Sequence, residues 1–298
     1  MPQTPMTVLP GVSVAEPSGP RLTRTGTERW HEVVDPVWAR LRNEAEEARG
    51  REPLMASFLT GAILGQPSLE AVIGERIAAR LDHPDIPGSA IRAAFFEATN
   101  DDKTIAQALR ADIMAVVDRD PAATRTLEPV LYFKGFHAIQ THRLAHWLWT
   151  HGQQNFALYL QSRASAVYAV DIHPAVPMGR GIFFDHATGI VVGATSVIED
   201  DVSILQGVTL GGTGKESGDR HPKIRRGVLI GAGAKVLGNI EVGRCARVAA
   251  GSVVLKPVPR NTTVAGIPAK VVGEAGCAEP ARSMDQMFED NIFAGADI

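Results

Sequence analysis

The chain has 298 residues, 45% of them hydrophobic, enough for one large domain or two modest ones with a sizeable core. Lys and Arg total 30 and Asp and Glu total 33, so a net charge of -3 predicts neither a nucleic-acid nor a membrane partner. The only cysteines, Cys245 and Cys277, exclude a disulfide framework. Residues 1–20 lack a signal-peptide pattern, and no apolar run approaches the ~18 residues of a membrane span. We therefore expect a cytoplasmic protein.

The first part of the chain divides into an arm and a helical domain. Residues 1–28 are rich in Pro, Thr, Gly and Ser without periodicity, which predicts a mobile arm. Residues 29–169 carry apolar residues at helical spacing. The apolar positions are Ile73, Ile77 and Leu81, then Ile105, Leu109, Ile113 and Val116, then Phe136, Leu144, Trp147 and Leu148. Prolines 87, 121 and 129 are expected to break the segment into several helices.

Residues 170–273 change to a period of six. Apolar residues at one phase are Val192, Ile198, Ile204 and Leu210, then Ile224, Ile230, Val236, Val242, Val248 and Val254. Small or β-branched residues follow four positions after most of them. Such a hexapeptide repeat predicts a parallel β-helix, in which each strand and turn forms one side of a triangular coil. The fold class is thus α+β, helices first and β-helix second.

The repeat is interrupted twice. Between Leu210 and Ile224 the phase slips and a glycine-rich polar loop, residues 211–222, intrudes. A second slip surrounds residues 184–189, which include His186. Loops on a rigid scaffold often carry function, whereas a purely structural solenoid has no need of such interruptions.

These interruptions lie within motifs that resemble the serine acetyltransferase family. The motifs are VDIHP (170–174), DHATG (185–189), GGTGK (211–215), DRHPKI (219–224), DRDP (118–121), YFKGFH (132–137) and the less specific GIPAK (266–270). The resemblance covers roughly residues 30–275. It implies a left-handed β-helix and transfer of an acetyl group from acetyl-CoA to L-serine, without an acyl-enzyme.

The resemblance also assigns roles. A serine hydroxyl needs a general base to attack a thioester, and His186 is implied as that base with Asp171 orienting it. Asp120 and Asp185 are implied on the ammonium of serine, and Arg220 and His221 on its carboxylate. For the CoA arm and phosphates, the implied residues are Gly212, Thr213, Gly231, Ala232 and Lys270. A glycine at a coil corner also serves turn geometry alone.

Partners follow from the same resemblance. A homotrimer, or a hexamer of two trimers, is implied, with active sites between neighbouring coils. L-cysteine is expected to inhibit in competition with serine. Residues 274–298 lose the period and predict a flexible tail, whose terminal Ile298 resembles the family's docking segment for O-acetylserine sulfhydrylase.

Three other interpretations compete with this one. The chain could acetylate homoserine or a sugar, although the motif around Arg220 favours a free amino acid. It could be a metal-dependent lyase that holds zinc with His173, His186 and His221; His142 and His146 also lie four residues apart on an expected helix. It could be a scaffold for partner enzymes without chemistry of its own. We expect no bound metal.

Overall fold

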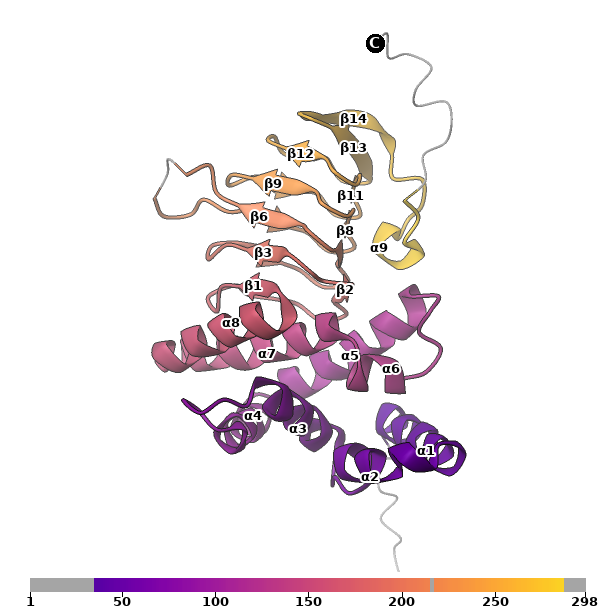
Figure 1. Ribbon diagram of the computed structural model, residues 1–298. Helices are drawn as coiled ribbons and strands as arrows, with labels where there is room; N and C mark the ends of the chain where they lie inside the picture. Colours follow the sequence, from indigo (N-terminus) through magenta and orange to yellow (C-terminus); the bar gives the residue numbers. More distant parts are fainter. Residues whose placement is uncertain (1–34, 215–216, 287–298) are drawn as a thin grey trace, which may run out of the picture. The chain divides into compact units, whose positions relative to one another are not determined.

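The computed structural model describes residues 35–214 and 217–286, which belong to one compact unit beginning at Asp35. Helices occupy the first part (Figure 1). They are α1 (Pro36–Arg51), the 3-10 turn η1 (Pro53–Met55), α2 (Ala56–Leu59), the π-turn η2 (Thr60–Leu64), α3 (Leu69–Leu81), α4 (Gly88–Asp101), α5 (Lys103–Arg119), α6 (Leu127–Leu131), α7 (Lys134–Thr150) and α8 (Gln154–Tyr168). None of the described helices is both long and apolar enough to cross a membrane.

The predicted helical faces are confirmed. Every apolar residue that the sequence selects on α3, α5 and α7 is buried. Local chemistry fixes several helix starts: the side chains of Asp35, Ser68 and Asp102 accept hydrogen bonds from backbone amides in the first turns of α1, α3 and α5. The expectation that Pro129 breaks a helix is wrong, because Pro129 lies in the first turn of α6, where its missing N–H costs no intrahelical hydrogen bond.

Short strands follow and stack in parallel. They are β1 (Val170–Ile172), β2 (Phe183–Asp185), β3 (Ile190–Val192), β4 (Val197–Ile198), β5 (Ser203–Leu205), β6 (Thr209–Gly211), β7 (Lys223–Ile224), β8 (Leu229–Ile230), β9 (Lys235–Leu237), β10 (Glu241–Val242), β11 (Arg247–Val248), β12 (Val253–Val254), β13 (Thr262–Gly266) and β14 (Ala269–Glu274). All ten apolar residues of the period-six phase are buried, as predicted. Only β14 is antiparallel to its neighbour among these paired strands.

The strands form three sheets, one on each side of the coil. Sheet A has the order β1-β3-β6-β9-β12, sheet B has β10-β7-β4, and sheet C has β14-β13-β11-β8-β5-β2. We call the passage from sheet C to sheet A the first corner, from A to B the second corner, and from B to C the third corner. The loop at residues 212–222 leaves the second corner between β6 and β7. Figure 1 shows the strands of sheet A stacked beyond α7 and α8.

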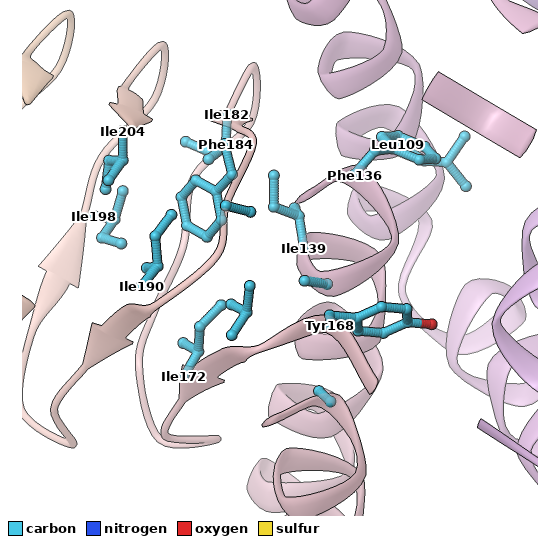
Figure 2. Close-up of a cluster of buried hydrophobic side chains, with 14 of the residues drawn as sticks. Leu109, Phe136, Ile139, Tyr168, Ile172, Ile182, Phe184, Ile190, Ile198 and Ile204 are labelled. Carbon is cyan, nitrogen blue, oxygen red and sulfur yellow. The ribbon is translucent and has the colours of Figure 1, made fainter. Parts of the chain in front are cut away.

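The helices and the first coil share one continuous hydrophobic core. Ile139 of α7 lies against Phe184 and Ile182 of the first coil, and Phe136 packs beside Leu109 of α5 (Figure 2). As a result, the end of β2 packs against the first turns of α7. The predicted base, His186, directly follows β2.

The C-terminal segment differs from the flexible tail expected from Glu274 onward. β14 runs to Glu274, and a short helix, α9 (Pro280–Ser283), packs against α5 and β8. Ser203 Oγ donates a hydrogen bond to the Ala281 carbonyl (2.7 Å), and Arg282 pairs with Asp118 (2.7 Å). The predicted mobile arm, residues 1–28, and the terminal Ile298 lie outside the described residues.

Candidate active site

The first corner is longer in the first coil than in the coils above it. In the strand register, residues 186–189 lie between Asp185 and Ile190, whereas only residues 206–207 lie between the aligned positions of the next coil, Leu205 and Val208; residues 232–233 and 250–251 take the same place in the later coils. The Gly207 amide donates to the Thr188 carbonyl (2.8 Å), which aligns Thr188 with Gln206 and Gly189 with Gly207. His186 and Ala187 are therefore a two-residue insertion, and this explains the second slip of the repeat.

The backbone of this insertion is strained. His186 (φ 52°) and Ala187 (φ 59°) both adopt the left-handed conformation, which costs a residue with a side chain roughly 1–2 kcal/mol. The Ala187 amide donates to the Asp185 carbonyl and the Thr188 amide to the His186 carbonyl, so two very tight turns follow each other. Such strain persists only where surrounding contacts hold it, and it is frequent at functional sites.

Three predicted site residues meet at this corner. His186 Nε2 lies 3.7 Å from Asp185 Oδ1, and the imidazole is 76% exposed. Asp120, at the C-terminal cap of α5, lies close enough to Asp185 to interact with it electrostatically. Burial of Asp185 raises the pKa of its carboxyl; neighbouring Asp120 raises this pKa further, while His186 opposes the shift. Two carboxylates crowded in this way favour a cation between them.

A second group of predicted residues lies at the second corner. The amides of Arg220 and His221 both donate to Thr195 Oγ1 (3.0 Å each), which fixes the end of the polar loop. The Thr195 amide donates to His221 Nδ1 (3.2 Å), so the proton of the neutral ring is on Nε2. The ring lies over Gly193, where a Cβ would come within 2.1 Å of Nε2.

Burial and neighbouring cations lower the pKa of His221, and Asp171 interacts with the nearby His173. Burial lowers the pKa of His221, and Arg220 and Lys223 lower it further. Burial also lowers the pKa of His173, with an opposing interaction from Asp171 and a reinforcing one from Arg220. Asp171 thus interacts with charged groups of the second corner. Its carboxylate accepts a hydrogen bond from Gln161 Nε2 (2.6 Å).

The two groups stay apart within one chain. Within residues 35–214 and 217–286, no hydrogen bond or ion pair joins Asp120, Asp185 and His186 to Arg220 and His221. A strand of sheet A separates the corners, and three residues at about 3.3 Å each span roughly 10 Å. The pairing of Asp171 with His186 is not formed in the single chain and stays a prediction.

The predicted cofactor residues divide in the same way. Gly212 and Thr213 follow β6 at the second corner, where the virtual Cβ of Gly212 would lie 3.2 Å from Arg220 Cδ. Gly231 and Ala232 follow β8 at the first corner. A Cβ on Gly231 would lie 2.5 Å from the Ala250 amide, so close stacking of coils already requires this glycine. Lys270 is exposed on β14.

Sequence reasoning missed residues that position the predicted ones. Thr195 organises the loop end, Gln161 contacts Asp171, and Lys134 at the start of α7 donates a hydrogen bond to Thr188 Oγ1. The YFKGFH motif contained the signal for Lys134, but spacing along the chain does not reveal a contact between residues 54 positions apart.

A cavity of about 650 Å³ lies elsewhere, at the third corner, with Arg119, Arg226 and Arg282 among its lining. It contains none of the predicted site residues. Two of the histidines weighed as metal ligands contact backbone carbonyls instead: His142 is buried with Nε2 against the Val176 carbonyl (2.9 Å), and His146 contacts the Pro174 carbonyl. No group of three or more His, Cys, Asp or Glu suited to a metal occurs among the described residues.

Comparison with known proteins gives matches over most of the chain. A family model described as "Serine acetyltransferase, N-terminal" matches residues 37–141, and one described as "Bacterial transferase hexapeptide (six repeats)" matches residues 221–256. Serine acetyltransferase of Salmonella typhimurium is 53% identical over 257 residues, which cover 86% of this chain and 94% of that protein.

Solved structures agree. The serine acetyltransferase of Brucella abortus in complex with coenzyme A is 61% identical with a TM-score of 0.81, covering 82% of this chain and 98% of that one. A serine acetyltransferase in complex with cysteine is 53% identical with a TM-score of 0.83, covering 85% and 98%. The β-helix is of the left-handed kind that the hexapeptide motifs imply. The chain belongs to the serine acetyltransferase family.

Proposed function

We propose that the chain transfers the acetyl group of acetyl-CoA to the hydroxyl of L-serine, giving O-acetyl-L-serine and CoA, the first step of cysteine biosynthesis. The observation that carries this proposal is the group at the first corner, where an exposed imidazole, His186, lies beside the crowded carboxylates of Asp120 and Asp185. This group offers a base for a hydroxyl and an anionic site for an adjacent ammonium, as an amino acid with a β-hydroxyl requires.

The reaction proceeds by direct attack. His186 takes the hydroxyl proton as the serine oxygen bonds to the thioester carbonyl carbon. The tetrahedral intermediate then collapses, the C–S bond breaks, and the imidazolium returns the proton to the leaving sulfur. No cysteine takes part: Cys245 and Cys277 are both free and lie outside the described groups at the first two corners. Asp171 is proposed to orient His186 in the assembled site.

Serine recognition needs both signs of charge. Asp120 and Asp185 receive the ammonium, and their mutual repulsion is relieved when it binds. Arg220 and the Nε2–H of neutral His221 receive the carboxylate, because His221 Nδ1 is already occupied by Thr195. The acids and the base lie at the first corner, and the carboxylate-binding residues lie at the second.

We propose that a second copy of the chain completes the site. The first corner of one subunit then faces the second corner of its neighbour, which brings Asp171, Arg220 and His221 to His186. A homotrimer closes three such interfaces, and pairing of two trimers gives a hexamer. The split of the predicted CoA residues between the same two corners supports this arrangement, with Gly212 and Thr213 on one subunit and Gly231 and Ala232 on the other. Lys270 is proposed near the phosphates.

Regulation and partners complete the proposal. L-cysteine differs from serine by sulfur for oxygen, so the same charged groups hold it and it inhibits in competition with serine; a related serine acetyltransferase has been solved with cysteine bound. O-acetylserine sulfhydrylase is the proposed partner of Ile298. We propose two domains in a cytoplasmic enzyme, a helical domain (29–169), which supplies Asp120 to the serine site, and an acyltransferase domain (170–273).

The test is release of free thiol from acetyl-CoA when L-serine is added. L-serine should support turnover at least tenfold faster than L-homoserine or a simple sugar at equal concentration. Equal or faster turnover with either alternative acceptor would replace serine as the substrate, and no thiol release with any of them would reject the acetyltransferase assignment.

A further inference from the structure

The start of α7 contacts the corner that carries His186, and nothing in the proposed mechanism uses this contact. Lys134 is the first residue of α7, and Gly135 is the second. Both belong to the YFKGFH motif, and they lie opposite the two-residue insertion of His186 and Ala187.

Gly135 lies against the backbone of the corner. A Cβ at this position would come within 2.2 Å of the Phe184 carbonyl oxygen and 3.2 Å of the Ala187 Cβ. Since a Cβ does not approach a backbone oxygen closer than about 3 Å, any residue other than glycine pushes α7 away from the end of β2. Gly135 therefore sets how closely the helix supports the insertion, and Ala187, which is fully buried, is held beneath it.

Lys134 reaches the other end of the insertion. Its ammonium donates to Thr188 Oγ1, and the Thr188 hydroxyl in turn lies 3.5 Å from the His186 carbonyl oxygen. This connection is the side-chain hydrogen bond that links the helices to residues 186–189 among the described residues. It ends on the carbonyl oxygen of His186, whose backbone has a left-handed φ of 52°.

We propose that Lys134 and Gly135 are positioning residues, which hold the inserted corner so that the His186 imidazole meets the acceptor hydroxyl. The inference rests on the proposed function of His186. The later coils turn the same corner with a glycine in the left-handed position, Gly207, Gly233 or Gly251, and need no such support. The first coil keeps a glycine at this position, Gly189, but adds His186 and Ala187, two residues with side chains in the left-handed conformation, and the helix supplies the restraint that these two added residues require.

The first test replaces Lys134 with Met, which keeps the length of the side chain and removes its donor. The expected result is a fall in kcat of about 10- to 100-fold, with KM for acetyl-CoA within twofold, because misplacing a reacting group by about 1 Å costs on that order. Lys134→Arg should recover most of the lost kcat. Lys103→Met is the matched control, since Lys103 is likewise the first residue of a helix, α5, and bonds only to nearby groups.

Thr188→Val tests the same connection from its other end. Its kcat should fall as for Lys134→Met. The double variant should lose no more kcat than either single variant, because both substitutions remove the same hydrogen bond, between Lys134 and Thr188. Fully additive losses, or a kcat within twofold of the unmodified enzyme for both single variants, would overturn the role of Lys134. A parallel rise in both KM values with a lowered thermal midpoint would also overturn it, in favour of a general folding role.

Gly135→Ala tests the close approach of the helix, with Gly50→Ala as control because nothing lies within 4 Å of a Cβ at Gly50. We expect a kcat loss of about 100-fold for Gly135→Ala and none for Gly50→Ala. Unchanged kcat in soluble Gly135→Ala enzyme would overturn the inference; if that variant does not fold, the Lys134 and Thr188 variants decide it. His186→Ala, measured alongside, separates the two hypotheses: activity in His186→Ala refutes the base, whereas an inactive His186→Ala with active Lys134→Met and Thr188→Val refutes only the positioning.

Discussion

Asp112 of α5 and Arg143 of α7 form an ion pair that is buried between the helices and the first coil. Arg143 Nη2 lies 2.7 Å from Asp112 Oδ2, and Asp112 is fully buried. Each partner also reaches the coil: Asp112 Oδ1 accepts from the Ile182 amide (2.9 Å), and Arg143 donates to the Gly179 carbonyl (2.7 Å). The pair therefore fastens the coil that carries His186 to the helices.

The Asp112→Asn variant should lose about 3–5 kcal/mol of unfolding free energy, because a buried guanidinium then lacks its counter-ion. Urea denaturation followed by circular dichroism measures this loss. The control is Glu46→Gln, since Glu46 pairs with Arg49 on the surface and should contribute less than about 1 kcal/mol. Similar losses in the two variants would contradict the special role of the buried pair.

His186→Ala should reduce kcat by about 10²- to 10⁴-fold while CoA binding, measured by calorimetry, persists. The base acts on the reacting hydroxyl and has no part in holding the cofactor. Asp171→Asn should have a smaller effect, through the orientation of the imidazole. A His186→Ala enzyme with near-normal turnover would refute the assignment.

Mixed oligomers test whether the site lies between subunits. His186→Ala damages the first corner and Arg220→Ala the second, so co-refolding the two variants creates interfaces with both corners intact. Activity at low serine concentration should rise above that of either variant alone. In the control mixture, His186→Ala with Asp120→Ala, the first corner of every subunit is damaged, so activity should not rise above that of the two variants measured separately. Failure of the first mixture in oligomers proved to be mixed would place the whole site within one chain.

Stability should decrease as the pH falls below about 6.5. Burial lowers the pKa of His142 to about 3 and that of His137 to about 4, so the unfolded chain binds protons at pH 5 that the folded chain does not. This contribution to the free energy of unfolding is complete above the pKa of histidine in the unfolded chain. At pH 5 the protein should lose about 2 kcal/mol of unfolding free energy for each of the two histidines. Urea denaturation at pH 5, 6 and 7.5 should show this slope, and the slope should be reduced in His142→Gln. Equal slopes in the unmodified protein and in His142→Gln would contradict the assignment.

Deletion of Ile298 should weaken binding to O-acetylserine sulfhydrylase at least tenfold in calorimetry, because the partner loses both an apolar side chain and a carboxylate in its original position. O-acetylserine should compete with the full-length tail for the same site. Acetyltransferase activity should persist, since the proposed catalytic residues precede the tail. Undiminished affinity after the deletion would refute the docking.

The period of six predicted the coil well, because each apolar residue at that phase has one possible environment, the interior. Ile224, Ile230 and Val236 are all fully buried as expected. Helix boundaries were less predictable: Pro129 fits inside α6 because the first helical turn does not use its N–H. The segment around Ala281 packs on α5 through contacts between residues far apart in the chain, Ser203 with Ala281 and Asp118 with Arg282. No local sequence pattern encodes such contacts.

The site residues were named from motifs, but their division between two corners was not visible in the sequence. Spacing along the chain places Asp171 and His186 fifteen positions apart, yet they fall on a strand of sheet A and at the end of a strand of sheet C. Register with later coils was needed to show that His186 and Ala187 are an insertion. The contact of Gly135 with Phe184 likewise depends on how α7 docks.

Because α7 and the first coil share one core, the β-helix depends on α7 and is not an independent folding unit. Ile182 and Phe184 are covered by Ile139 of α7, so the coil has no closed lower end of its own (Figure 2). A fragment that starts at Val170 would expose this apolar end to water, and fragments of that kind self-associate. Exchange of catalytic coils between relatives must therefore carry α7 along with them.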